Sequence, residues 1–447
     1  MRRWIAPLVA AMVVAGVAFG LLHRDPGWTA SSPQALEEFQ LGLEALSKIY
    51  YGEAQAHFEK ALELDPGFVA AKLFLVQRIP TDPPRREALI REIRAADLDA
   101  LTPRERFLVQ RFLAAHDGHE AEATKITDAY LEKHPDDPYA LELQAGRVFA
   151  RGQWSEAEGE YKKLVEIVPN RVIAYNQMGY AQMAQGRFAE AEATFVKYRF
   201  IAPDQANPHD SLGELLALTG HYDRAEREFR NALAVKPDFW ASYSHLLTLA
   251  VMRGDYDAAA RVIAEAEGTP GFPASDIPRM RRSADLHRAV AERRWDDLAR
   301  LSGQCTWKED PDLEILAHDV LLSAGRPEAA KAIESSYAGV YRKGGGAGLP
   351  VAPGDAVALH LEGARLLSEG HAAEAVKDLQ KTDDLLAYAD LNRGTFKLFN
   401  RALLVEALRR AGQEARARTL MAEITAVNSS FARTVAEPMA QGGLPAS

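Results

Sequence analysis

The sequence has 447 residues, of which 47% are hydrophobic and 26% are charged, and these proportions are typical of a folded chain and exclude a mainly disordered one. Its 53 lysine and arginine residues against 63 aspartate and glutamate residues give a formal net charge of −10, which disfavours binding to nucleic-acid phosphates. The single cysteine, Cys305, excludes an intrachain disulfide and a zinc site built from paired thiols.

The first element is an uncharged apolar run at residues 4–22, preceded by Arg2 and Arg3. At a rise of about 1.5 Å per residue, such a helix just crosses a hydrocarbon core about 30 Å thick. We therefore expect residues 1–23 to form a single-pass anchor in an inner (cytoplasmic) membrane, with the N-terminus inside, followed by a linker at residues 24–33. The alternative is a secretory signal cleaved near residues 18–20, which would leave a soluble periplasmic protein.

Three residue types then recur every 34 positions over residues 104–271. Glycines stand at 118, 152, 186, 220 and 254, alanines at 123, 157, 191, 225 and 259, and prolines at 135, 169, 203 and 237. Such a glycine ends a first helix in a left-handed conformation, the alanine allows two helices to pack closely, and the proline stops the second helix. Each row is thus expected to form a helix pair that buries its apolar face only against neighbouring pairs.

The row with Leu212, Gly213, Ala225, Phe229 and Pro237 resembles the tetratricopeptide repeat nearly position by position. The resemblance identifies the chain as a bacterial, membrane-anchored member of that family. It implies an all-α fold, a right-handed superhelical solenoid of antiparallel helix pairs behind one N-terminal transmembrane helix. Weaker rows extend the solenoid over residues 34–342, followed by a Gly/Pro linker at 343–355, C-terminal helix pairs at 356–432 and a disordered tail at 433–447.

Sequence motifs for catalysis, nucleotide binding or calcium binding are absent, so we expect a protein that is not an enzyme and has no cofactor or metal. His116 and His119 flank a glycine of the repeat register, where polar residues are expected without a metal. Cys305, near Trp307, is expected to be a structural thiol. The alternative is an enzyme or signalling component with an unrecognised site in the irregular region 272–341.

In the tetratricopeptide family the first helices of successive repeats line a concave groove, and the resemblance places apolar and acidic residues there. This expected groove set is Phe112, Tyr139, Glu142, Phe149, Asn176, Tyr180, Met183, Asp210, Glu214 and Met252. We expect a protein-protein interaction scaffold or adaptor at the extracytoplasmic face of the membrane, binding a protein or peptide with apolar and basic groups. Alternatively, the aromatic members of the set merely pack between adjacent repeats.

Overall fold

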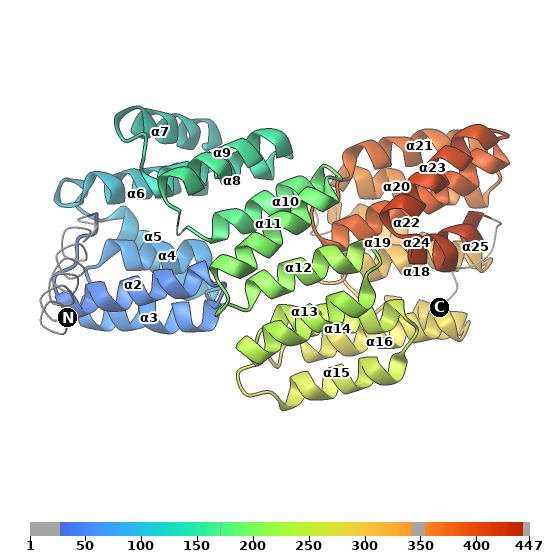
Figure 1. The fold of residues 1–447 in the computed structure, drawn as a ribbon, viewed down its shortest axis with the longest axis horizontal. Coiled ribbons are helices and arrows are strands. Elements are labelled where there is room, and N and C mark those ends of the chain that lie inside the picture. The colour runs from blue at the N-terminus through green and yellow to red at the C-terminus, as the bar shows by residue number, and fades with distance from the viewer. Residues whose placement is uncertain (1–26, 170, 342–353, 441–447) are drawn as a thin grey trace, which may run out of the picture. The chain divides into compact units, whose positions relative to one another are not determined.

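The computed structural model describes residues 27–169, 171–341 and 354–440, and every element described there is a helix (Figure 1). The expected all-α array of helix pairs is therefore confirmed within these residues. The chain divides into two compact units, residues 1–143 and 144–447, with the boundary inside one helix. The expected anchor or signal at residues 1–23 and most of the expected linker at 343–355 lie outside the described residues. None of the helices described is both long and apolar enough to cross a membrane.

The first unit consists of helix pairs around an aromatic core. Its helices are α2 (Pro33–Ser47), α3 (Tyr51–Leu64), α4 (Val69–Arg78), α5 (Pro83–Arg94), the short 3-10 turn η1 (Leu98–Ala100), α6 (Pro103–His116), α7 (Glu120–Lys133) and the start of α8 (Pro138–Ala150). Phe39, Phe58 and Phe68 are fully buried at its centre. The prolines that open α2, α5 and α6 occupy the first helical turn, where their missing N–H has no intrahelical partner to lose.

The segment expected as a linker at residues 24–33 is packed into the first unit from Gly27 onwards. Trp28 is buried, with its ring edge-on to Phe39 at 5.0 Å and to Tyr139 at 5.2 Å. The backbone N–H of Thr29 donates to Glu105 at 2.8 Å. A tryptophan buries a large apolar area, and together with backbone hydrogen bonds such as this one it attaches the segment to the first unit.

The second unit contains the regular repeats and the C-terminal helices. The regular repeats form the rest of α8, α9 (Trp154–Ile167), α10 (Ile173–Ala184), α11 (Phe188–Ile201), α12 (Asn207–Leu218), α13 (Tyr222–Val235), α14 (Trp240–Met252) and α15 (Tyr256–Gly268). The others are α16 (Ile277–Ala291), α17 (Trp295–Ser302), α18 (Pro311–Ser323), α19 (Pro327–Tyr341), α20 (Gly354–Ser368), α21 (Ala372–Leu385), α22 (Leu391–Arg410), α23 (Glu414–Val427), α24 (Ser429–Phe431), the π-helical turn η2 (Ala432–Ala436) and α25 (Glu437–Ala440).

The repeat register has a physical cause in two kinds of glycine. Gly220 has φ of +78°, a left-handed conformation that ends α12 without the strain a side chain would add. Gly213 lies within α12, and a Cβ there would be only 2.4 Å from the ring of Phe229 on α13. Gly179 and Phe195 repeat this approach, also at 2.4 Å, in the preceding pair. Where the Leu-Gly and Phe positions of the pattern are both occupied, as in these two pairs, they form one close contact between the two helices.

The C-terminal residues 433–447, expected to be disordered, are helical as far as Ala440, and residues 441–447 lie outside the described part. Ala436 and Met439 are buried, and α25 packs against α22. The expectation was wrong for residues 433–440 because their alanine, valine and methionine side chains supply an apolar face that α22 covers.

Candidate binding site on the inner helix face

The inner face of the second unit, formed by the first helices α10, α12 and α14, is where several expected groove residues lie. Every residue of α12 except His209 is buried. Part of this burial comes from the C-terminal segment, which we define as residues 386–431. Its backbone N–H at Leu391 donates to Oε2 of Glu214 at 3.1 Å, and the side-chain amide of Asn428 donates to the carbonyl of Leu218 at 3.0 Å. The chain itself thus covers the middle of its inner face.

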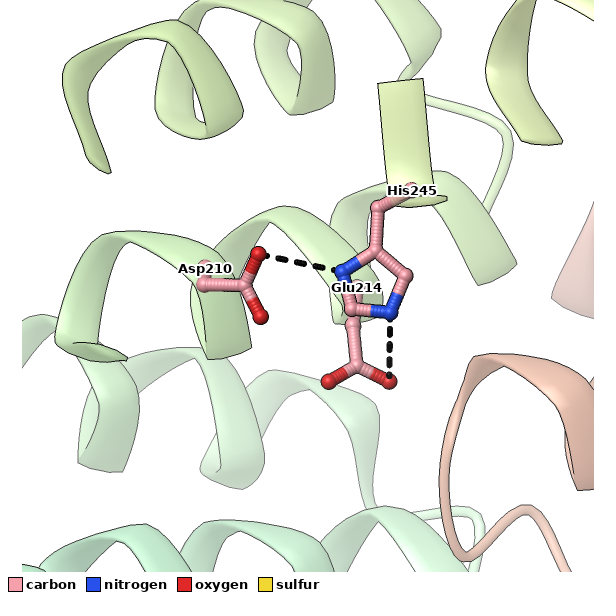
Figure 2. A group of neighbouring side chains, drawn as sticks. All are labelled: Asp210, Glu214 and His245. Carbon is pink, nitrogen blue, oxygen red and sulfur yellow. Dashed lines mark hydrogen bonds and ion pairs between the residues drawn. The ribbon is translucent and has the colours of Figure 1, made fainter. Parts of the chain in front are cut away.

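The centre of this face is a buried cluster of two carboxylates and one imidazole (Figure 2). Asp210 and Glu214 are four residues apart on α12, so both side chains lie on one helical face. His245 on α14 lies between them, with Nδ1 at 3.0 Å from Oδ1 of Asp210 and Nε2 at 3.9 Å from Oε2 of Glu214. The hydroxyl of Ser242 also donates to Oδ1 of Asp210, at 2.6 Å.

The electrostatics of the cluster favour a protonated imidazole. Burial by itself lowers the pKa of His245, but the carboxylates of Asp210 and Glu214 outweigh burial and raise this pKa to about 9. Burial raises the pKa of Glu214, as does the negative charge of Asp210, while His245 acts in the opposite direction. At neutral pH the cluster therefore contains an imidazolium that joins α14 to α12.

Tyr180 on α10 completes the cluster from the other side. Its hydroxyl donates to Oε1 of Glu214 at 2.5 Å and lies 3.2 Å from Oγ of Ser211. Burial and the adjacent Glu214 carboxylate hold the pKa of Tyr180 well above its usual value, so the phenol remains a donor. Its ring is edge-on to Phe195 at 5.2 Å. The phenol of Tyr180 is thus used within the chain.

Asp210, Glu214 and His245 are also the one group among the described residues whose side chains are close enough to hold a metal ion, with ligand atoms within 4.8 Å of one another. Carboxylate oxygen and imidazole nitrogen are ligand types that zinc accepts. However, each of these ligand atoms already has a hydrogen-bond or ionic partner within the chain. These three side chains therefore satisfy one another as an ionic contact between α12 and α14, without a metal ion.

The other expected groove residues do not join this cluster. Asn176 and Met183 are buried in α10, and Phe149 is half-buried with its ring edge-on to Trp154 at 5.0 Å. Met252 is half-buried at the end of α14 and lines a cavity described below. In the first unit, Phe112 is buried, Tyr139 is half-buried against Trp28, and Glu142 pairs with Arg78 at 3.3 Å. Whether this set binds a partner stays a prediction.

Sequence reasoning missed three members of the site: Ser242, His245 and Leu391. His245 is not in the groove set that the resemblance assigns, whose member in the same row is Met252. Leu391 contributes only a backbone N–H, and it comes from a helix outside the regular register. A side chain pointing between two repeats and a backbone donor leave no signal in a periodic pattern.

The irregular region 272–341 contains the one cysteine. Burial and the carboxylates of Asp310 and Glu314 raise the pKa of Cys305 to about 12, and its Sγ–H donates to the carbonyl of Leu301 at 3.7 Å. A nucleophilic cysteine requires the opposite, a pKa lowered by nearby positive charge. The expected structural role of Cys305 agrees with these surroundings.

A family model of the tetratricopeptide repeat matches residues 39–68, 147–206 and 212–274. The chain therefore contains tetratricopeptide repeats, and this part of the prediction is confirmed. The matched ranges include most of the stretch in which the 34-residue register is free of insertions.

Solved structures of similar proteins share low sequence identity with this chain. PilW, described as a widely conserved type IV pilus biogenesis factor, is 17% identical, with a TM-score of 0.32, covering 55% of this chain and 97% of PilW. A tetratricopeptide repeat protein from Parabacteroides merdae is 18% identical, with a TM-score of 0.35, covering 61% of this chain and 92% of that protein. A chain of the APC/C hetero-tetramer Cut9-Hcn1 is 13% identical, with a TM-score of 0.47. The match covers 94% of this chain and 72% of that one. No partner or activity follows from likenesses this distant.

Proposed function

We propose that this protein is a non-enzymatic scaffold that binds a partner protein through the outer edge of its regular repeats. Tetratricopeptide repeats generally serve protein interaction. The inner face, where the resemblance placed the groove, is covered at α12 by the C-terminal segment through Leu391 and Asn428. The groove would have to lose these contacts before a partner could reach Asp210 or Glu214. A partner could reach the exposed ends of the second helices α9, α11 and α13, which we call the outer edge, without displacing the C-terminal segment.

The observation that carries the proposal is a row of exposed apolar side chains at the repeat spacing. Ile167, Ile201 and Val235 are 34 positions apart, at the ends of α9, α11 and α13, and they are 41%, 37% and 37% exposed. Phe200 beside Ile201 is 84% exposed, and Val196 one turn earlier is also exposed. We call these five residues the outer ridge. Single exposed apolar residues are common, but a regular row of them is typical of an interaction surface.

The second helices that carry the outer ridge are held side by side by ion pairs. Arg224 on α13 contacts Glu192 on α11 at 2.6 Å, and Arg187 at the start of α11 contacts Glu158 on α9. Both pairs lie in the first turns of these helices, and Arg199 on α11 also contacts Glu228 on α13 nearer to the ridge. An apolar strip on a partner would bury the ridge, and the phenyl ring of Phe200 offers the largest area for this contact.

The test is site-specific photocrosslinking in cells, followed by affinity measurement with the captured partner. A photoreactive residue at Phe200 is expected to capture a partner, whereas one at Leu385, which is 46% exposed on α21, is not. Phe200→Glu should weaken binding at least tenfold, about 1.4 kcal/mol, because it places a charge at the centre of an apolar contact. Since Phe200 is exposed, the thermal midpoint should remain that of the parent.

Leu385→Glu is the matched control, because it introduces the same charge at another exposed apolar position of the same unit. Capture of a partner from Phe149 on α8, a member of the expected groove set, with Phe200→Glu binding as tightly as the parent, would show that the expected groove and not the outer ridge is the binding surface.

A further inference from the structure

A cavity of about 200 Å³ lies within the second unit, next to the covered inner face. Its lining residues come mainly from α14, α16 and α18 and from α22 and η2. Thr434 and Val435 of the π-helical turn line it directly. Single π-helical turns widen a helix locally and are frequent at functional sites. The cavity is thus lined both by the first helices α14, α16 and α18 and by α22 and η2 near the end of the chain.

Most of the cavity surface is apolar. The apolar side chains that line it include Val251, Val290, Leu316, Val320, Phe396 and Phe399. An apolar cavity of about 150 Å³ in another protein holds a benzene ring. The space is therefore sufficient for a small molecule with an apolar body.

His287 on α16 supplies a defined hydrogen-bond acceptor to this cavity. Its Nδ1 lies 2.8 Å from the carbonyl oxygen of Ser283, and because a carbonyl can only accept, Nδ1 carries the proton. Burial lowers the pKa of His287, so the imidazole is neutral at pH 7. Nε2 is then left with a lone pair that accepts a hydrogen bond.

Two carboxylates on α18 line the cavity, and each is already paired within the chain. Asp319 accepts hydrogen bonds from His318 at 2.9 Å and from His360 at 2.8 Å, and although burial opposes ionisation, these histidines lower the pKa of Asp319 to about 2. Asp312 also lines the cavity and pairs with Arg279 at 3.2 Å. No lysine or arginine is among the described residues that line the cavity, so an anionic ligand would lose its hydration without gaining a cationic partner, and anions are disfavoured.

We propose that this cavity binds a neutral, mainly apolar small molecule of about the size of a bicyclic aromatic, which donates one hydrogen bond to Nε2 of His287. Thr395 and Asn392 of α22 also line the cavity and add two further polar side chains to it. This site is separate from the outer ridge and does not depend on the proposed scaffold function.

The test measures binding of three matched probes to the full chain by titration calorimetry. Naphthol is neutral and has one O–H donor, methoxynaphthalene has the same rings and oxygen without the donor, and naphthalene sulfonate has the rings with a negative charge. Naphthol is expected to bind with one-to-one stoichiometry. Methoxynaphthalene should bind about 3–10-fold more weakly, which is the range for one lost hydrogen bond. The sulfonate should bind more weakly than either.

Two variants assign the probe to the cavity. His287→Phe keeps a ring but removes the acceptor, so naphthol and methoxynaphthalene should bind it equally, whereas the exposed control His371→Phe should keep their difference. Thr395→Trp should fill the cavity and abolish binding of all probes. If Thr395→Trp does not fold, the comparison of naphthol with methoxynaphthalene in His287→Phe decides whether the probe binds in the cavity. Equal binding of both neutral probes by the parent, a difference that persists in His287→Phe, or sulfonate binding as tight as naphthol binding would overturn the proposal.

Discussion

Replacing His245 by alanine is expected to lower the free energy of unfolding by about 3–5 kcal/mol, one of the two largest single-residue effects we predict. The variant leaves Asp210 and Glu214 on the same face of α12 without the imidazolium that lies between them. Removing one partner of a buried ionic contact costs more than the contact contributes, because the remaining charge stays buried. Chemical denaturation at pH 7 gives the measurement, with the exposed His221→Ala as control.

The same cluster predicts a pH dependence with a defined sign. The folded-state pKa of His245, about 9, is above its ordinary value of 6.5, so folding favours the protonated form. Its contribution is fully present below about pH 6.5 and is lost as the pH rises through about 9. The parent should therefore lose stability over this window, and His245→Ala should lose less. Parent and variant curves that remain parallel from neutral to alkaline pH would show that His245 is not an ionised bridge.

Replacing Gly394 by leucine is expected to have the second large effect, a loss of about 2–3 kcal/mol of stability through overpacking. A Cβ at Gly394 on α22 would be 2.7 Å from the Cδ atoms of Leu218 on α12, so a larger side chain fits only if α22 moves away. Such a movement would also break the hydrogen bond from Leu391, the first residue of α22, to Glu214 on α12. Thermal melts compare the variant with the parent.

Gly159→Leu in α9 is the matched control, because a Cβ at Gly159 would meet no atom within 4 Å. Leucine has a higher helix propensity than glycine, so this control should be slightly more stable than the parent. If the two leucine variants melt at the same temperature, α22 is not packed on α12 as described.

The helix pairs of the regular repeats could be predicted from the sequence because their causes are local and recur. Gly220 ends α12, Gly213 makes room for Phe229, and Pro237 follows the end of α13. Each of these effects acts within one row of 34 residues and is repeated in the next. Tyr180 and Glu214 are also 34 positions apart, and the structure joins them by a hydrogen bond that the sequence analysis did not predict.

The contacts that cover the inner face could not be predicted in this way. Leu391 and Glu214 are 177 positions apart, and Asn428 and Leu218 are 210 positions apart. The C-terminal helices could pack on many apolar faces, and the choice among these depends on shape and on a few buried polar groups. In the first unit, the docking of Trp28 was missed for a related reason, because a single aromatic residue in a polar segment has no periodicity.

Amide hydrogen exchange at Leu391 tests most directly whether the C-terminal segment covers α12. Leu391 is the first residue of α22, so its N–H has no acceptor within that helix and is protected only through Glu214. The N–H of Arg393, which the side chain of Asp390 caps at 2.7 Å, is the internal control. We expect Leu391 to be protected in the parent and to exchange freely in Glu214→Ala, while Arg393 remains protected in both. Free exchange of Leu391 in the parent would contradict the docking of α22 on the inner face.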